Sequence, residues 1–223
     1  MESIVYNVFV KMGNQEVAAV TFHKNKNADQ PAEEKKLSWQ QNLLLYVHDL
    51  IYLLAVIIVV FILFFRLVVV SGSSMYSTLW DGDWLLVLGN TLYQEPEYGD
   101  IIVVCKESFN DSEPIIKRVI ATEGQTVDID FVSGTVFVDG KMLDEDYTYT
   151  PTNRNEGTEF PVTVPEGCVF ALGDNRNDSL DSRYPAIGMI DKREILGKAL
   201  FLFYPGTNEG RSTRDFDRIG AVN

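Results

Sequence analysis

Hydrophobic and polar positions divide the chain into one long apolar run and many short ones. From Leu43 to Phe65 most residues are apolar, and from Leu50 to Phe65 none is charged. A helix needs about 20 such residues to cross the hydrocarbon core of a bilayer. The run starts too far into the chain for a cleaved signal peptide, which occupies about the first 15–30 residues. We therefore expect one transmembrane helix over residues 43–66.

After this run, short apolar segments alternate with turn signals such as Asp81-Gly82-Asp83, Asp139-Gly140 and Pro205-Gly206. The candidate strands are Leu67–Ser71, Trp84–Leu88, Ile101–Cys105, Ile115–Ile120, Thr126–Phe131, Thr135–Val138, Val162–Val164, Cys168–Leu172 and Leu196–Phe203. Many short strands without long helices between them predict a mostly β fold, with an antiparallel sheet in a domain over residues 67–223.

The segment before the helix, residues 1–42, carries no evident chemistry. Residues 1–22 alternate apolar and polar in places, which indicates a short hairpin, and residues 24–41 are polar enough for a flexible tether. Lys35 and Lys36 precede the apolar run, whereas only Arg66 follows it before Lys106. The positive-inside rule then predicts a single-pass protein of the cell membrane, with residues 1–42 in the cytoplasm, residues 67–223 outside, and the lipid bilayer as a partner.

Charge and cysteine content exclude several classes of function. The net charge is −13, and the acidic surplus lies after residue 66, which argues against a nucleic-acid partner and favours a soluble, acidic domain. Two cysteines are too few for a disulfide-rich scaffold or a four-ligand zinc site. Cys105 and Cys168 lie in apolar surroundings, as buried thiols or as one disulfide. Nothing in the sequence asks for a metal or a cofactor.

The only histidines, His23 and His48, precede the predicted domain. A Ser-His-Asp triad, a Cys-His pair and a histidine-ligated metal are therefore excluded there. A hydrolase built on this domain needs a carboxylate or a lysine as its base.

Ser74 is a candidate nucleophile. It lies in a cluster of small hydroxyl residues, 71–79, at the end of a predicted strand, where backbone N–H groups can point at a developing oxyanion. Taken alone, such serine and glycine clusters are most often plain turns.

Lys117 is a candidate base. On a strand it shares an apolar face with Ile115 and Val119, while Arg118 points the other way. Burial lowers the pKa of a lysine, and the neutral amine can accept a serine proton. The alternative is a lysine that reaches water or pairs with a carboxylate.

A third cluster, residues 173–183, places acids, amides, hydroxyls and arginines directly after an apolar strand. Charge-assisted hydrogen bonds from such a loop can fix neighbouring groups. The alternatives are a solvated loop or a calcium loop, although the EF-hand pattern does not fit.

Together these segments resemble bacterial type I signal peptidases. The anchor is followed in order by SGSSMYSTL (71–79), GDIIVVCK (99–106), IIKRVIATEG (115–124) and GDNRNDSLDSR (173–183), and the resemblance covers about residues 50–205. It implies a Ser/Lys dyad on a mostly β fold that removes signal peptides from secretory pre-proteins by cutting after small residues in an Ala-X-Ala pattern.

The resemblance also assigns roles to residues. It makes Ser74 the nucleophile and Lys117 the general base, with Ser179 orienting the lysine amine through a hydrogen bond. The Ser74 N–H belongs to the oxyanion hole, and Gly72 stands where some relatives have a serine as second donor. Ion pairs that support the site come from Arg118, Asp174, Asp181 and Arg183, and small substrate pockets are lined by Met75 and Ile115.

The chain departs from the family at Ser77, where proline is usual, and at residues 121–125, where GLPGD is common. Two other enzyme classes and one non-enzymatic class are the alternatives. A self-cleaving Ser/Lys repressor conflicts with the membrane anchor, and a sortase-like transpeptidase needs a histidine that the domain lacks. A non-enzymatic, membrane-tethered β domain that binds an envelope partner is distinguished by the distance between Ser74 Oγ and Lys117 Nζ.

Overall fold

The computed structural model describes residues 5–8, 11–12, 15–16, 20–23, 38–106, 113–207 and 213–222. The chain divides into two units, residues 1–52 and 53–223, which are described separately. In the first unit, β1 (Val5–Val8) pairs antiparallel with β4 (Val20–His23), and β2 (Lys11–Met12) pairs with β3 (Gln15–Glu16). The pairing predicted for residues 1–22 is therefore present. Residues 24–37 of the predicted tether lie outside the described residues.

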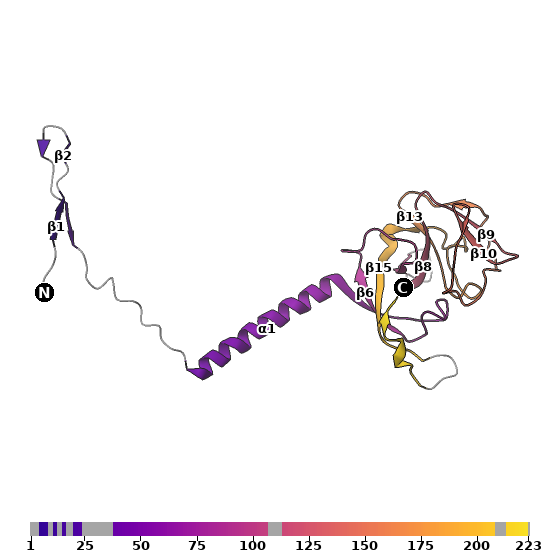
Figure 1. Cartoon of the computed structure of the whole chain (residues 1–223), viewed down its shortest axis with the longest axis horizontal. Helices are drawn as coiled ribbons and strands as arrows, with labels where there is room; N and C mark the ends of the chain where they lie inside the picture. Colours follow the sequence, from indigo (N-terminus) through magenta and orange to yellow (C-terminus); the bar gives the residue numbers. More distant parts are fainter. Residues whose placement is uncertain are drawn as a thin grey trace. The chain divides into compact units, whose positions relative to one another are not determined.

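The apolar run forms helix α1 (Trp39–Phe64), drawn in purple in Figure 1. A capping box starts it: the Gln41 backbone N–H donates to Ser38 Oγ at 3.3 Å, and the Ser38 N–H donates to Gln41 Oε1 at 3.0 Å. The helix thus begins four residues before the predicted start at residue 43 and ends two residues before the predicted end at residue 66. Of the part of the chain that the structure describes, it is the one helix long and apolar enough to cross a membrane. At 1.5 Å per residue its 26 residues span about 39 Å.

The second unit is built on an antiparallel sheet in the order β14-β13-β8-β7-β15-β6-β5, with β16 pairing β15 (Figure 1). Its strands are β5 (Phe65–Val69), β6 (Trp84–Gly89), β7 (Ile101–Val104), β8 (Ile115–Thr122), β13 (Cys168–Leu172), β14 (Ile190–Asp191), β15 (Ile195–Tyr204) and β16 (Gly220–Ala221). Two short 3₁₀ helices, η3 (Lys192–Glu194) and η4 (Phe216–Arg218), precede β15 and β16.

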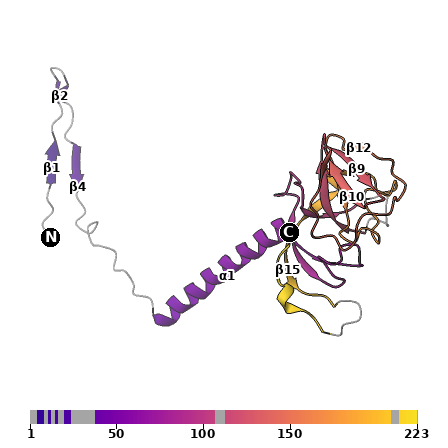
Figure 2. The ribbon, with the colours of Figure 1, turned by 45° about the vertical axis from the view of Figure 1, so that its right-hand side comes forward.

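A smaller antiparallel sheet has the order β11-β10-β9-β12, and Figure 2 shows β9, β10 and β12 together. Its strands are β9 (Thr126–Asp130), β10 (Thr135–Val138), β11 (Lys141–Met142) and β12 (Val162–Thr163). The predicted mostly β, antiparallel fold with one N-terminal helix is confirmed. The two-residue strands β11, β14 and β16 are too short to give an alternating pattern and were not predicted.

Strand β8 connects the parts of the domain. It pairs with β7 through Ile102↔Lys117 and with β13 through Leu172↔Arg118. Val119 on one face of β8 belongs to a core cluster with Ile102, while Ile116 and Ile120 on the other face belong to two further clusters. The alternation predicted for residues 115–120 therefore holds, and Lys117 and Arg118 point to opposite sides. Cys105 and Cys168 carry separate thiols and share no disulfide.

Candidate active site

The loop between β5 and β6, residues 70–83, presents Ser74. Its two ends are held together, because the Val70 N–H donates to the Asp83 carbonyl at 2.8 Å and the Gly82 N–H donates back to the Val70 carbonyl at 2.9 Å. Before Ser74 the chain passes through Gly72, whose φ of +89° few other residues adopt. The Gly72 N–H donates to Asp81 Oδ1 at 2.8 Å. This network holds the loop in a fixed conformation around the serine.

Lys117 approaches the serine from β8, an interior strand of the sheet. Only 3% of the residue is exposed, and its Nζ lies 2.8 Å from Ser74 Oγ. The same amine donates to the Ile116 carbonyl at 2.8 Å. The structure thus brings together the two side chains that the sequence had singled out, which are 43 positions apart in the chain.

The electrostatic surroundings favour a neutral amine. Burial is the main cause and lowers the pKa of Lys117 to about 8, and the Arg183 guanidinium acts in the same direction. The carboxylates of Asp181 and Asp174 oppose this shift. A substantial fraction of the amine is therefore unprotonated near pH 8 and can accept the hydroxyl proton.

The loop after β13, residues 173–183, packs directly on the nucleophile. The Asn175 N–H donates to the Ser74 carbonyl at 3.0 Å, and Asn175 Nδ2 donates to the Ser73 carbonyl at 3.2 Å. Ser73 Oγ in turn donates to Asp178 Oδ2 at 2.7 Å. A Cβ on Gly173 would collide with Ser179 Oγ and the Ser74 carbonyl, so this position requires glycine. The third sequence cluster therefore forms part of the site and is not a free surface loop.

Ser179 does not make the predicted bond. Its Oγ is buried and has no hydrogen-bond partner among the described residues. The Lys117 amine instead bonds to Ser74 Oγ and to the Ile116 carbonyl. The expectation that Ser179 orients the amine by a hydrogen bond is therefore corrected for this structure: the main chain of β8 holds the amine.

Two buried ion pairs flank the dyad, formed by the four residues named from the sequence. Arg118 donates two hydrogen bonds to Asp174, at 2.9 and 2.8 Å. Arg183 donates two to Asp181, also at 2.9 and 2.8 Å. Each of these side chains is at most 2% exposed. Such bidentate pairs fix the geometry of buried charges, although desolvation limits their contribution to stability.

Sequence reasoning missed a third pair, Arg176 with Glu145. Arg176 donates to both Glu145 oxygens, at 2.8 and 2.5 Å, and to Thr152 Oγ1 at 2.8 Å. It thereby ties the loop after β13 to the segment after β11. Arg176 belongs to the polar cluster of residues 173–183, but nothing in the sequence around Glu145 indicates that it is the partner of Arg176.

A cleft of about 500 Å³ opens at the dyad, and Ile115 lies in its wall. Met75 does not line it: the residue is 1% exposed and packs in the core with Leu79 and Leu85. The expectation that Met75 forms a substrate pocket surface is corrected, since its side chain is buried in the core. The other residues lining the cleft are Ser71, Gly72, Ser73, Ser74, Lys117, Arg154, Glu156, Asn177, Asp178, Ser179, Leu180 and Tyr184.

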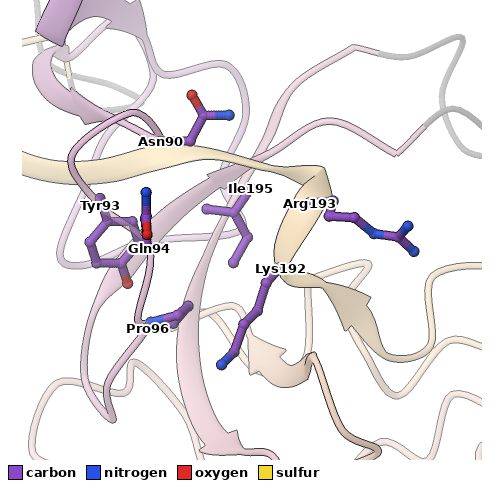
Figure 3. Close-up of a pocket in the computed structure, with 7 residues that line it drawn as sticks. All are labelled: Asn90, Tyr93, Gln94, Pro96, Lys192, Arg193 and Ile195. Carbon is purple, nitrogen blue, oxygen red and sulfur yellow. The ribbon is translucent and has the colours of Figure 1, made fainter.

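A smaller pocket of about 220 Å³, shown in Figure 3, lies away from the dyad between the segment after β6 and η3. Its two cationic side chains are already paired, Lys192 with Glu95 and Glu123, and Arg193 with Asp191. Among the residues described, no group of three or more metal-ligating side chains comes together. Of these two pockets, the cleft at Ser74 is the one that contains a serine hydroxyl next to a buried amine.

Comparison with known proteins agrees with this geometry. The profile of the family described as "Signal peptidase, peptidase S26" matches residues 43–204. "Signal peptidase I" of Bacillus licheniformis is 34% identical over 191 residues, covering 81% of this chain and 98% of that protein. "Signal peptidase I T" of Bacillus subtilis (strain 168) is 34% identical over 208 residues, covering 87% and 100%.

A crystal structure of a signal peptidase I from Enterococcus faecalis V583 is 32% identical, with a TM-score of 0.38, and covers 47% of this chain and 96% of that chain. Membership of a peptidase family excludes the alternative of a non-enzymatic domain. The chain belongs to the signal peptidase family, peptidase S26, and is a membrane-anchored serine peptidase.

Proposed function

We propose that this enzyme removes signal peptides from secretory pre-proteins, with Ser74 as nucleophile and Lys117 as general base. One observation carries the assignment: a buried lysine amine lies 2.8 Å from a serine hydroxyl at the floor of an open cleft. Ser74 Oγ attacks the scissile carbonyl and the amine takes its proton. The protonated amine then donates to the leaving nitrogen, and water hydrolyses the acyl-enzyme.

The backbone N–H of Ser74 is proposed as an oxyanion donor. Within the described part of the chain it makes no hydrogen bond, so it is available to the developing negative charge. Ser73 Oγ already donates to Asp178 and does not serve as a second donor in this arrangement. Ile115 in the cleft wall restricts the space beside the dyad, which supports cleavage after small residues of the Ala-X-Ala type.

The test uses purified full-length enzyme and a secretory pre-protein, with the new N-terminus sequenced. Ser74→Ala and Lys117→Ala are each expected to lower kcat/KM by about 10⁴-fold or more. The matched controls Ser133→Ala and Lys141→Ala change the same residue types in the β9–β10 turn and in β11, and both should cleave normally. Wild-type cleavage by either dyad variant would overturn the mechanism.

We further propose that residues 67–223 lie outside the cytoplasm and contact lipid. Strand β5 follows α1 without a linker, and its exposed Leu67 and Val69 pair with Leu86 and Trp84 of β6. On the other side of β6, Leu86 lies opposite Phe201, which is also exposed. This continuous apolar face next to the anchor suits a bilayer surface.

Orientation is tested by adding a protease to intact spheroplasts. Loss of the domain with retention of an N-terminal epitope supports the proposed topology. Protection of the domain contradicts it.

A further inference from the structure

The last described segment of the chain, residues 213–222, lies beyond the region matched by the family profile, which ends at residue 204. It folds back on the domain: β16 pairs with β15, and Val222 is buried in the same core cluster as Met75 and Leu79. Between the matched region and β16, η4 ends at Arg218. This arginine reaches the loop that carries Ser74.

Arg218 is bound to the nucleophile loop at three places. Its guanidinium donates to both oxygens of Asp83, at 2.9 and 2.7 Å, and to the Thr78 carbonyl at 3.1 Å. It also lies 3.8 Å from the ring centroid of Trp80. Asp83 is fully buried and further accepts from the backbone N–H groups of Trp80 and Gly206, at 2.7 and 2.6 Å.

From these contacts two connections lead to the reacting atoms. Thr78, whose carbonyl accepts from Arg218, donates through Oγ1 to Asp174 at 2.5 Å. Asp174 holds Arg118, the neighbour of Lys117. Along the other route, Trp80 stacks on Tyr76, two residues after the nucleophile, with ring centroids 6.4 Å apart. Arg218 thus holds the part of the nucleophile loop that follows Ser74, whereas Asn175 holds the Ser73 and Ser74 carbonyls.

We propose that Arg218 is a positioning residue for Ser74, so that the C-terminal segment is part of the catalytic machinery; this rests on the proposed function. The guanidinium does not touch the reacting atoms. It holds the backbone of Thr78 and the ring of Trp80, and therefore the distance between the hydroxyl and the Lys117 amine. A displacement of about 1 Å in such a pair costs about 10²-fold in rate.

The experiment measures how fast Ser74 is acylated. Full-length enzyme is treated with a small activated ester, and intact mass gives both the rate of labelling and the final number of acyl groups per chain. Arg218→Ala is expected to slow labelling about 10- to 100-fold, while the final stoichiometry stays at that of the wild type. Millimolar guanidinium should restore part of the rate in this variant alone. If Arg218→Ala instead reduced the fraction of enzyme that is folded, the number of acyl groups per chain would fall and guanidinium would not restore it.

Two further variants keep the test decisive. Arg218→Lys retains a positive charge beside buried Asp83, so we expect it to fold. A single ammonium nitrogen then replaces the two nitrogens that bond Asp83 and Thr78, and it has no planar group to stack on Trp80. Labelling of this variant should be slowed several-fold. Arg214→Ala is the matched control, since Arg214 stacks on Tyr204 and donates to the Pro205 carbonyl without contacting the loop.

Wild-type labelling rates in both Arg218 variants would overturn the inference. The inference would also be overturned if an Arg218 variant carried fewer acyl groups per chain than the wild type but was labelled at the wild-type rate. Equal labelling of Ser74→Ala and wild type would instead overturn the proposed function, so the two failures are distinguishable.

Discussion

The surroundings of the dyad and the small sheet β9–β12 are built in opposite ways. Around Ser74 and Lys117 the buried side chains include three arginines and two aspartates (Arg118, Arg176, Arg183, Asp174 and Asp181). Within β9–β12, the buried side chains that the structure describes are all apolar, such as Val127, Ile129 and Val136. Buried ion pairs add little stability after desolvation, whereas apolar burial stabilises directly. The first region therefore fixes geometry, and the second supplies stability.

The strongest test of this contrast is Lys117→Met. We expect kcat/KM to fall about 10⁴-fold, because the base is lost. The free energy of unfolding should stay the same or rise by about 1–3 kcal/mol, because an apolar side chain of similar size replaces a buried amine. Urea titration and a cleavage assay measure the two quantities, with Lys141→Met in β11 as the control. A clear loss of stability would show that the amine supports the fold as well.

Asp174→Asn should be the most destabilising change near the site. It leaves the Arg118 guanidinium buried without its carboxylate, which costs about 3–5 kcal/mol. Activity should fall as well, since the amide keeps only one of the two acceptor oxygens that Arg118 and Thr78 use. The exposed Asp128 in β9 supplies the control, and Asp128→Asn should change stability by less than about 0.5 kcal/mol. Equal effects of the two variants on urea midpoints would contradict the comparison.

The pH dependence separates the dyad from the apolar core. Because burial lowers the pKa of Lys117 to about 8, kcat/KM should rise with pH and level off above that value. In the unfolded chain the pKa returns to 10.5, so between these values the unfolded state binds more protons. The contribution of this group therefore raises the free energy of unfolding by about 3 kcal/mol from pH 8 to 10.5, and below pH 8 that contribution no longer changes with pH.

The free energy of unfolding is measured against pH for the wild type and for Lys117→Met. Subtracting the curve of the variant from that of the wild type isolates the contribution of the Lys117 amine from those of other titrating groups. Through this window the free energy of unfolding of the wild type should rise by about 3 kcal/mol relative to that of the variant. A constant difference would mean that the amine is not the group that titrates.

The smallest expected effect is that of Ile129→Val in the small sheet. Removing one buried methylene group costs about 0.5–1.5 kcal/mol. Because this residue belongs to the apolar cluster of β9–β12, kcat/KM of the folded enzyme should remain that of the wild type. A change of more than about twofold in kcat/KM would show that the two regions are coupled.

Much of the fold could be predicted because local patterns encode it. Alternation along residues 115–120 placed Lys117 and Arg118 on opposite faces, and the charge-free run gave the helix. The helix start was missed although Ser38 and Gln41 form a readable capping box. Met75 was misplaced because apolarity alone does not distinguish a pocket wall from the core beneath it.

Long-range polar contacts could not be predicted. Arg218 and Asp83 are 135 positions apart, and Arg176 and Glu145 are 31 apart. The chain has 32 acidic residues, so the sequence alone does not indicate which of them pairs with a given arginine. The hydrogen bond expected of Ser179 failed for a related reason, since a backbone carbonyl of β8 competes for the same amine.

The direct passage from α1 into β5 limits how far the enzyme can reach. Ser74 follows the last helical residue, Phe64, by ten positions, and an extended chain covers about 3.3–3.6 Å per residue. The hydroxyl therefore stays within about 36 Å of the end of the helix. Under the proposed function, this short connection limits the distance between the cleaved peptide bond and the end of the anchor helix to about the same length, however well the sequence around that bond fits the cleft.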